Sequence, residues 1–533
     1  MIDGAFTGSA RFELRRRLGE GGMGVVYEAF DRERAAPVAL KALRTPGPEL
    51  LLRLKQEFRA LQDVRHPNLV GMGELFEARG QWFFTMDLVD GVPFWDHVRP
   101  SADPPAIGDA DTVKIAGATA RGLAALDETR LREALAQLAL GLQHLHQVGK
   151  VHRDVKPSNI LVDREGRVVL VDFGLVASAD ERRGTGDVVG TVAYMAPEQA
   201  AGAAVGGAAD WYALGVLLYE ALTGQLPFDG APLQILLDKQ RLVPPPPHAI
   251  APGVPADLDE LALELLRFDP AARPSGATIL ARLGAASAPE AARTSGASSG
   301  FVGRDAELAT LEAAAADVAP DHPVMVYVHG GSGVGKSALV ARFTAAQAID
   351  PAVVVLHGRC YEREAVPYKA VDGVVDALAD YLQGLPRGEA AALLPRRAAL
   401  LVDVFPVLGK VEVLAEAPRG PDLRDPQELR TRLFDAAREL FARLCDRRRV
   451  VVAIDDLQWA DPDSLALLAA LIRAPEAPPL LLVATVRGPD DDAAAAGARL
   501  ALPGDLRHLS LAPLGPTDAR ALAARLVGRV EGD

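Results

Sequence analysis

The sequence predicts an α+β domain with two lobes, followed by a three-layer α/β domain with a parallel sheet. Three observations lead to this prediction. Residues 12–89 carry short strand patterns separated by glycine turns, together with one amphipathic helix. Residues 90–283 are dominated by helical spacing of apolar residues. From residue 301 onwards, apolar strands alternate with helices, which is the order that builds a parallel sheet.

The boundaries follow from composition. Residues 1–11 are expected to be an N-terminal tail, and residues 284–300 are rich in Ala, Ser and Gly, which predicts a flexible linker. The first domain therefore covers residues 12–283 and the second covers residues 301–533. Residues 100–125 interrupt the helical lobe with Asp, Ala, Gly and Pro, so we expect an insertion loop there.

Composition narrows the class of protein. The net charge of −14, from 57 basic and 71 acidic residues, argues against a general nucleic-acid or anionic-membrane partner, because both require a basic face. Cys360 and Cys445 are the only cysteines, so a disulfide framework is excluded. The sequence shows neither a signal peptide nor an apolar run long enough to span a bilayer. We therefore expect a soluble, cytoplasmic protein that binds neither nucleic acid nor membrane.

The first strands enclose a glycine-rich turn. Gly19, Gly21 and Gly24 would let backbone amides approach phosphates without a Cβ in the way, although glycine hairpins of this kind are common. Val38–Lys41 alternates as a strand with a lysine at its end. The predicted helix 49–64 places Glu57 on its apolar stripe. A buried carboxylate needs a partner, and Lys41 is the natural one.

A long amphipathic helix at 128–148 leads to Val151–Asn159, the stretch on which the first domain depends. Asp154 is placed to accept a proton from a hydroxyl nucleophile, and Lys156 can neutralise charge on a transferring phosphate. Asn159 and Asp172 offer hard oxygen ligands for Mg²⁺. Each of these residues alone would favour a structural role, but their joint occurrence points to phosphoryl transfer from ATP.

The motifs of residues 12–283 resemble those of the bacterial, eukaryotic-like Ser/Thr protein kinases. The resemblance rests on the glycine turn, on Val151–Asn159, on Asp172-Phe173-Gly174, on Ala196-Pro197-Glu198 and on Asp210–Gly215. It implies a bilobal kinase fold and an enzyme that transfers the ATP γ-phosphate to protein Ser/Thr. A lysine at position 156 of the catalytic loop is typical of the Ser/Thr kinases. Lys41, Glu57, Asp154 and Lys156 are the implied catalytic residues.

The resemblance also implies further roles. Asp87–Val89 would form the hinge between the lobes, and Arg273 would pair with Glu198. Arg153 would receive a phosphate from the activation segment, for which the candidate acceptors are Ser178, Thr185 and Thr191. Thr191 is better suited to hydrogen-bonding near Asp154. The implied ATP-binding residues are Gly19, Gly21, Gly24, Val26, Ala39, Lys41, Met86, Asp87 and Val89.

A second phosphate site follows the strand at 323–329. The sequence 330–337 matches G-x-x-x-x-G-K-[ST] between a strand and a helix, which is the context that this motif demands. Lys336 would reach the β- and γ-phosphates, and the Ser337 hydroxyl would coordinate Mg²⁺. The predicted ATP-binding residues of this loop are Gly330, Gly333, Gly335, Lys336 and Ser337.

Two later strands add candidates to this site. The buried strand 450–454 ends in Asp455, which suits Mg²⁺, and Asp456, which suits an attacking water. Arg487 follows another apolar strand and could sense phosphate. With Phe301-Val302-Gly303-Arg304, these motifs resemble the AAA-like ATPase modules of bacterial signalling proteins, which act as P-loop switches. We expect a lid-like helix at 517–526, either minimal or truncated, and we identify no arginine finger.

Taken together, the sequence predicts a cytoplasmic Ser/Thr protein kinase with a C-terminal ATP-binding switch that could also mediate self-association. Its expected cofactors are ATP and Mg²⁺, and its expected partners are proteins with Ser/Thr acceptors. One alternative is a pseudokinase scaffold that regulates a signalling ATPase; it is disfavoured because no catalytic position is lost. Another makes the ATPase the main activity under kinase control. The protein substrate cannot be read from the sequence.

Overall fold

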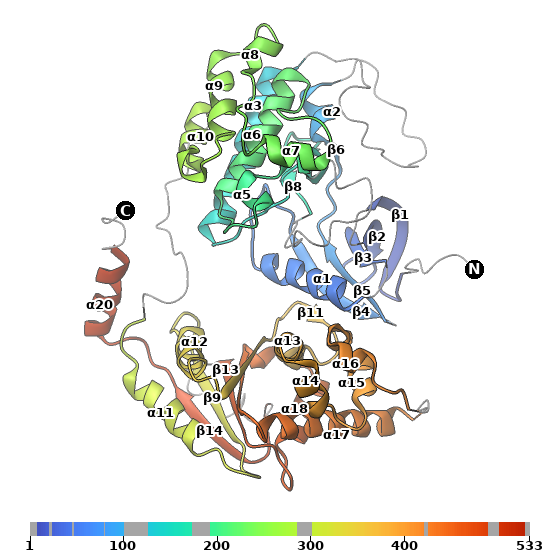
Figure 1. Cartoon of the computed structure of the whole chain (residues 1–533), viewed down its shortest axis with the longest axis vertical. Helices are drawn as coiled ribbons and strands as arrows, with labels where there is room; N and C mark the ends of the chain where they lie inside the picture. The colour runs from blue at the N-terminus through green and yellow to red at the C-terminus, as the bar shows by residue number, and fades with distance from the viewer. Residues whose placement is uncertain are drawn as a thin grey trace. The chain divides into compact units, whose positions relative to one another are not determined.

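The computed structural model describes residues 8–20, 24–44, 47–78, 80–100, 126–172, 192–284, 301–420, 425–488, 500 and 502–527. The chain forms two compact units, of which the first takes in most of residues 1–295 and the second takes in residues 296–533 (Figure 1). The predicted insertion loop and linker fall almost wholly outside the described residues. Gly21 and the three candidate phosphosites Ser178, Thr185 and Thr191 also lie outside them.

The first unit begins with a sheet whose strands run in the order β1–β2–β3–β5–β4. Their bounds are Phe12–Glu20 (β1), Gly24–Asp31 (β2), Ala36–Leu43 (β3), Met72–Ala78 (β4) and Gln81–Met86 (β5). The antiparallel register places Val26 opposite Lys41 and Ala39 opposite Met86. Four of the predicted nucleotide-binding residues are thus neighbours across three strands.

Helix α1 (Pro48–Leu61) packs against this sheet. Leu54, Phe58 and Leu61 recur at helical spacing and are all buried, so one face of α1 belongs to the core. The ring of Phe58 lies 5.8 Å from the ring of Phe84 on β5. This packing turns Glu57, one position before Phe58, towards the interior.

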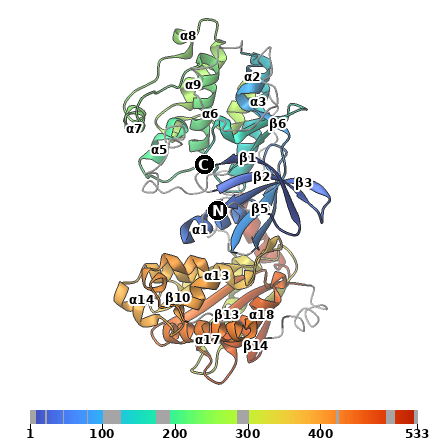
Figure 2. The same ribbon diagram turned by 90° about the vertical axis from the view of Figure 1, so that its right-hand side faces the viewer.

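The remainder of the first unit is helical, apart from a small antiparallel sheet of β6 (Gly91–Pro93), β7 (Ile160–Asp163) and β8 (Val168–Leu170). Figure 2 shows these helices gathered in one lobe. Helix α6 is buried along nearly its whole length and forms the centre of that lobe. The helices are α2 (Phe94–Val98), α3 (Glu128–Gln147), α5 (Pro197–Ala200), α6 (Ala208–Thr223), α7 (Pro232–Asp238), α8 (Pro247–Ile250), α9 (Ala256–Leu265) and α10 (Gly276–Arg282).

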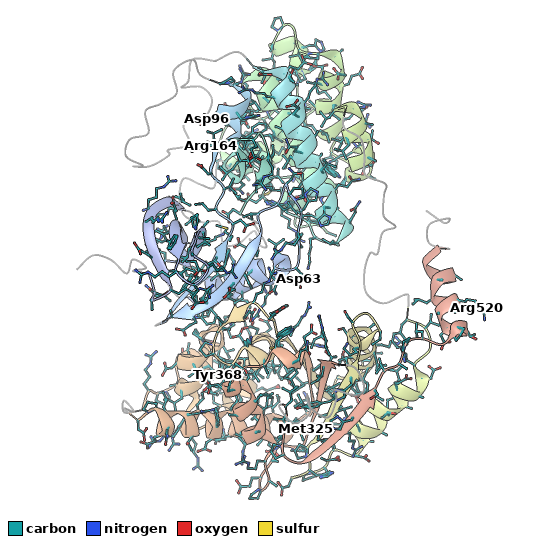
Figure 3. The ribbon with its side chains drawn as sticks, turned by 180° about the vertical axis from the view of Figure 1, so that it is seen from behind. Asp63, Asp96, Arg164, Met325, Tyr368 and Arg520 are labelled. Atoms are coloured by element: carbon teal, nitrogen blue, oxygen red, sulfur yellow. The ribbon has the colours of Figure 1, made fainter. Side chains whose placement is uncertain are left out.

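The second unit is built on a five-stranded sheet with the order β10–β12–β13–β9–β14, in which every pairing is parallel. The strands are β9 (Val324–Gly330), β10 (Val353–Arg359), β12 (Arg449–Asp455), β13 (Leu480–Arg487) and β14 (Asp505–Ser510). Successive residues of β9 alternate between two apolar clusters: Met325, labelled in Figure 3, belongs to one, and Val324 and Val326 belong to the other. Both faces of the sheet are therefore covered.

Helices α11 and α12 lie on one face of the sheet, and α13, α17 and α18 lie on the other (Figure 1). The helices of this unit are α11 (Asp305–Ala316), α12 (Lys336–Gln347), α13 (Lys369–Gln383), α14 (Arg387–Leu393), α15 (Ala398–Val404), α16 (Glu412–Ala415), α17 (Pro426–Cys445), α18 (Pro462–Ile472) and α20 (Pro516–Val527). A two-residue strand, β11, covers Glu364–Ala365.

The predicted fold class is confirmed: a two-lobed α+β unit precedes a three-layer α/β unit with a parallel sheet. The sequence had not indicated β10, β14 or the helices between residues 369 and 445. Within the part of the chain that the structure describes, none of the helices combines the length and the apolar character that crossing a membrane requires.

Candidate functional site

Three charged side chains from separate elements meet at the centre of the first unit. The Lys41 ammonium on β3 donates to both oxygens of Glu57 on α1, at 2.8 and 3.0 Å. It also donates to the carboxylate of Asp172, which follows β8. Lys41 is 6% exposed and Glu57 is 1% exposed. The ion pair expected from the apolar stripe of α1 is therefore present, and it joins the helix to the sheet.

Burial and charge compete in this cluster. Desolvation alone would lower the pKa of Lys41, but the carboxylates of Asp172 and Glu57 outweigh it and raise the pKa above its ordinary value. Burial raises the pKa of Glu57, because Lys41 offsets only part of the cost and Asp172 adds like charge. The Asp172 side chain is 49% exposed; partial desolvation opposes its ionisation, yet Lys41 and Lys156 bring its pKa below the usual range. The cluster thus holds a charged lysine next to an ionised Asp172.

The predicted catalytic loop brings a second group of polar atoms to the same place. Lys156 Nζ lies 2.8 Å from the Asp154 carboxylate. The side-chain amide of Asn159 donates to Asp154 Oδ2 at 3.0 Å, to the Asp154 carbonyl at 2.8 Å and to the Asp172 carbonyl at 3.3 Å. Asn159 is therefore the residue that joins the predicted proton acceptor to the predicted metal ligand.

The shape of this loop is fixed from α6. Asp210, 1% exposed, accepts hydrogen bonds from the backbone N–H groups of His152 and Arg153, at 2.9 and 2.8 Å. Its carboxylate also meets His146 Nε2 at 2.8 Å. Burial would raise the pKa of Asp210, but the hydrogen bond from His146 and the backbone donors lower it. The strained backbone of Arg153, at φ 68°, is held in place by these contacts.

The strand that ends at Met86 leads into the expected hinge. The Asp87 N–H donates to the Gly71 carbonyl at 2.9 Å. A Cβ on Gly71 would come 2.3 Å from Asp87 Oδ2, so the Asp87 side chain would have to move if residue 71 carried a side chain. The Asp87 side chain therefore lies against Gly71.

The glycine-rich turn is described at two of its three glycines. A Cβ on Gly24 would lie 2.2 Å from the carbonyl oxygen of Ala42, so β2 can approach β3 only because residue 24 has no side chain. A Cβ on Gly19 would meet nothing within 4 Å. The glycine at 24 is thus required by strand packing, whereas packing does not explain the glycine at 19. That position stays a prediction for phosphate binding.

The donors in this unit suit Mg²⁺. Magnesium is usually held by one or two protein oxygen ligands together with phosphate oxygens. Asp172 and Asn159 each carry a side-chain oxygen of this kind, and the Asn159 amide lies 3.3 Å from the Asp172 carbonyl, so the two residues fit that partial shell. Among the described residues no group of three or more His, Cys, Asp or Glu side chains is arranged to hold a metal by itself. Asp172 and Asn159 would therefore hold a Mg²⁺ ion only together with phosphate oxygens of a bound nucleotide.

In the second unit, the predicted phosphate loop follows β9 and ends in α12. Gly330, Gly333 and Gly335 all have positive φ, which an L-residue rarely adopts. Lys336 is 7% exposed, and its ammonium donates to the carbonyls of Gly330 and Gly331, both at 2.8 Å. Ser337 Oγ donates to both carboxylate oxygens of Asp455 at 2.9 Å. The hydroxyl and carboxylate predicted to hold Mg²⁺ are therefore adjacent.

The surroundings of Asp456 do not suit the expected role of orienting an attacking water. Its carboxylate receives Gln458 Nε2 at 2.8 Å, Arg487 Nε at 2.9 Å and Arg359 Nη2 at 3.2 Å. Burial raises the pKa of Asp456, but the hydrogen bonds from Gln458 and Arg487 and the charge of Arg359 lower it below the usual range. Both oxygens are engaged by cations or amides. Asp456 is thus placed as a counter-ion.

Two further arginines contact this site: Arg304, which the sequence placed only in the opening motif of the domain, and Arg359, which the sequence did not single out. Arg304, with a backbone φ of 70°, donates to the carbonyls of Val334 and Ala512, at 3.3 and 2.5 Å. Arg359 ends a strand that the sequence had not indicated. The apolar run at 353–356 was the signal that could have located that strand and its terminal arginine.

A two-lobed fold with a buried Lys–Glu pair beside an Asp–Lys–Asn loop defines a protein kinase domain, and residues 12–283 match the protein kinase domain family. Residues 300–483 match the AAA ATPase domain family. The chain belongs to the protein kinase family, and it carries a bacterial-type Ser/Thr protein kinase domain followed by an AAA ATPase domain.

Curated relatives match about half of this chain or somewhat more. Ser/Thr protein kinase Pkn1 of Myxococcus xanthus is 35% identical over 339 residues, which cover 61% of this chain and 44% of Pkn1. The DNA damage-responsive kinase RqkA of Deinococcus radiodurans is 38% identical over 283 residues, or 52% of this chain and 39% of RqkA. PknB of Mycobacterium tuberculosis is 34% identical over 274 residues, or 49% and 40%. The chain spans less than half the length of these relatives.

Proposed function

We propose that this chain is a Ser/Thr protein kinase that transfers the γ-phosphate of ATP to protein hydroxyl groups. The observation that carries the proposal is the bridge made by Asn159, which holds the Asp154 carboxylate next to Asp172 and hence next to the Lys41–Glu57 pair. These groups supply a proton acceptor, metal ligands and phosphate-binding cations in one place. The similarity to Ser/Thr kinases of three bacteria supports the same function.

Each side chain has a task that its contacts allow. ATP with Mg²⁺ would supply the phosphoryl group and the charge that steadies it. Lys41, kept charged by Glu57, is placed to bind phosphate oxygens. Asp172 and Asn159 are placed to hold the metal ion. Asp154 would orient the acceptor hydroxyl and take its proton, and Lys156, 2.8 Å from Asp154, would neutralise charge on the group in transfer.

Phosphate incorporation by the full chain tests this proposal. Radiolabelled ATP is the phosphate donor and dephosphorylated casein is the probe substrate. Asp154→Asn should lower the rate of phosphate transfer about 10²- to 10⁴-fold, because it removes the proton acceptor without changing the size of the side chain. Lys41→Met should also abolish transfer. The exposed Asp229→Asn is a matched control and should retain the wild-type rate. Equal incorporation by Asp154→Asn and the wild type would instead favour the pseudokinase scaffold.

The second unit is proposed to be an ATP-binding regulatory switch. The Lys336 ammonium held by two loop carbonyls, and the Ser337–Asp455 pair, support nucleotide binding. The contacts of Asp456 with Arg487 and Arg359 support slow hydrolysis, because a carboxylate whose charge is compensated by two arginines is a poor base. Lys336→Ala should remove nucleotide from this unit and leave Lys41-dependent phosphate transfer measurable. An unchanged transfer rate with and without Lys336 would contradict a regulatory role.

Other properties follow only from the sequence. The cytoplasmic location, the lack of a nucleic-acid or membrane partner and self-association through the ATPase domain stay predictions. Protein substrates with Ser/Thr acceptors are the partners that the proposed activity requires. Sedimentation of the full chain with and without Mg-ATP would test self-association, which predicts a larger species when nucleotide is bound.

A further inference from the structure

The apolar core of the second unit encloses a cavity of about 40 Å³. It lies between the strands β12 and β13 and the helices α13, α17 and α18, on the face of the sheet that those helices cover (Figure 1). Its wall includes Val375 of α13, Ala437 of α17, Val452 of β12, Leu468 of α18 and Leu482 of β13. The residues that line it are at most 7% exposed, so the cavity is closed off from the solvent.

The wall of this cavity offers no hydrogen bond to a water molecule. The lining residues are all Ala, Val, Leu, Ile or Phe, and within the described part of the chain no polar atom is exposed on the wall. A buried water needs about two to four polar partners, whereas an apolar cavity stays dry and takes up apolar ligands. The cavity therefore selects against water and against any ligand that carries hydrogen-bonding groups.

Hydrogen bonds around the cavity fix the positions of the three helices. The backbone N–H of Lys369, the first residue of α13, donates at 2.9 Å to the carboxylate of Asp461, which caps the start of α18. The guanidinium of Arg438 on α17 donates to the carbonyl of Ala470 near the end of α18. Both ends of α18 are thus tied to a neighbouring helix. Because a void persists where its surroundings cannot relax inwards, these contacts keep the cavity open.

The volume sets the size of the ligand. About 10–15 Å³ of such space holds one water-sized sphere, and an engineered apolar cavity of about 150 Å³ binds benzene or xenon. The cavity of about 40 Å³ lies between these limits, so it has room for a few heavy atoms but not for an aromatic ring.

We propose that the second unit binds one small apolar molecule, about the size of a xenon atom, in this cavity. The site is separate from the proposed nucleotide site, because α12, which follows the phosphate loop, covers the opposite face of the sheet. The inference therefore does not depend on nucleotide binding by this unit.

Methyl NMR of the full chain tests the proposal. The Leu and Val methyl groups are labelled with ¹³C, and spectra are recorded over a series of xenon pressures. The methyl signals of Val452 and Leu468 should shift and reach a plateau, because a single site saturates. The signals of Val451, which belongs to the other apolar cluster, should show only the small linear change that dissolved xenon causes. Benzene should cause no saturable shift, because it is too large for the cavity.

Val452→Ile adds one methyl group to the wall of the cavity, so the saturable shift of Leu468 should be lost. Val451→Ile is the matched control. Val451 is the neighbouring residue on β12 and is 4% exposed, as Val452 is, but it packs into the cluster on the other face of the sheet. It should keep the xenon shift. Ala437→Val fills the same space from α17 and should act as Val452→Ile does, so the test does not depend on the folding of one variant.

Each outcome decides the proposal. Loss of the xenon shift in Val452→Ile and Ala437→Val, with retention in Val451→Ile, supports it. The absence of a saturable shift in the wild type would overturn it. A saturable shift that survives in both filled variants would also overturn it, because xenon would then bind elsewhere. Saturable binding of benzene by the wild type would show that the core opens for larger molecules, which contradicts a site limited to small ones.

Discussion

The guanidinium of Arg273 donates to both carboxylate oxygens of Glu198, with Nη1–Oε1 at 2.7 Å and Nη2–Oε2 at 2.8 Å. The Arg273 side chain is fully buried, and it also donates to the carbonyls of Arg267 and Ala208, both at 2.8 Å. The resemblance to protein kinases predicted this pair from the sequence. Arg273 thereby connects α5, the start of α6 and the turn after α9.

Removing one partner of this pair should destabilise the first unit. Arg273→Met would leave Glu198 and the carbonyls of Arg267, Ala208 and Phe268 without their donor. Removing one partner of a buried ion pair typically costs about 3–5 kcal/mol. Urea unfolding followed by tryptophan fluorescence measures this loss, because Trp82, Trp95 and Trp211 all lie in the first unit. Arg282→Met, which breaks the more exposed 3.1 Å pair with Glu264, should cost less than about 1 kcal/mol. Equal losses in both variants would contradict the prediction.

Lys239 should affect the binding of protein substrate rather than of ATP. Its buried ammonium donates to the carbonyls of Val192, Ala193 and Met195, at 2.8, 2.5 and 2.8 Å. These residues precede α5, whose Gln199 donates to the carbonyl of Arg153 in the catalytic loop at 3.2 Å. We therefore expect an acceptor peptide, which has to reach Asp154 in the catalytic loop, to lie next to the segment 192–195.

Lys239→Met would leave those three carbonyls without a common donor, at about 1–3 kcal/mol for each unsatisfied group. We expect the KM for a peptide substrate to rise at least severalfold while the KM for ATP stays constant. Steady-state kinetics with each substrate varied in turn measures both constants. The exposed Arg241→Met is the control on the same stretch of chain. A parallel rise of both KM values would mean that the whole unit had loosened.

Glu220 should make the stability of the first unit depend on pH. Burial raises the pKa of Glu220, even though the hydroxyl of Tyr194 donates to its carboxylate. The folded state therefore keeps this proton to a higher pH than the unfolded state does. Stability is unaffected well below the unfolded-state pKa, and it falls as the pH rises towards the folded-state pKa.

Glu220→Gln keeps an acceptor for Tyr194 but removes the charge. Its melting temperature relative to the wild type should therefore be higher at pH 7 than at pH 4. Differential scanning calorimetry at the two pH values measures this difference. Glu260→Gln, which changes an exposed carboxyl on α9, should show no such dependence. A constant offset for Glu220→Gln at both pH values would refute the role of the buried charge.

The two described glycines of the nucleotide turn should respond differently to alanine. A methyl group at position 24 would overlap the Ala42 carbonyl, and overpacking of this kind costs about 1–3 kcal/mol. A methyl group at position 19 meets no atom within 4 Å. Thermal unfolding should therefore show a loss for Gly24→Ala and little change for Gly19→Ala. Equal melting temperatures would show that β2 can move away from β3 without cost.

The sequence predicted the kinase fold and the grouping of its charged residues well, because local chemistry constrained them. Glu57 lay on an apolar stripe and so required a cation, and Lys41 was available on a neighbouring strand. Asn159 lies within the catalytic stretch Val151–Asn159, and Asp172 follows it closely in the sequence. What could not be predicted was the anchoring of His152 by Asp210, since a contact across 58 residues leaves no local pattern.

The second unit was less predictable for a related reason. The phosphate loop can be recognised from its glycines, because they form a local motif. The neighbours of a parallel strand are set by the order of strands in the sheet, which no local pattern reveals. The sequence therefore gave no reason to assign Arg359 to the site; the pairing of β10 with β12 places it there. The same order placed Arg487 opposite Gly330 and both arginines on Asp456, which changed the expected role of that carboxylate.

The hydrogen bonds from His152 and Arg153 to Asp210 also bear on how the protein is synthesised. A ribosome that has reached residue 191 has already made Lys41, Asp154 and the residues that accompany them, but not the carboxylate that shapes their loop. The catalytic geometry can form only after α6 has left the exit tunnel and folded. The nascent kinase should therefore remain inactive until synthesis has passed well beyond Thr223, the last residue of α6, whatever the concentration of ATP around it.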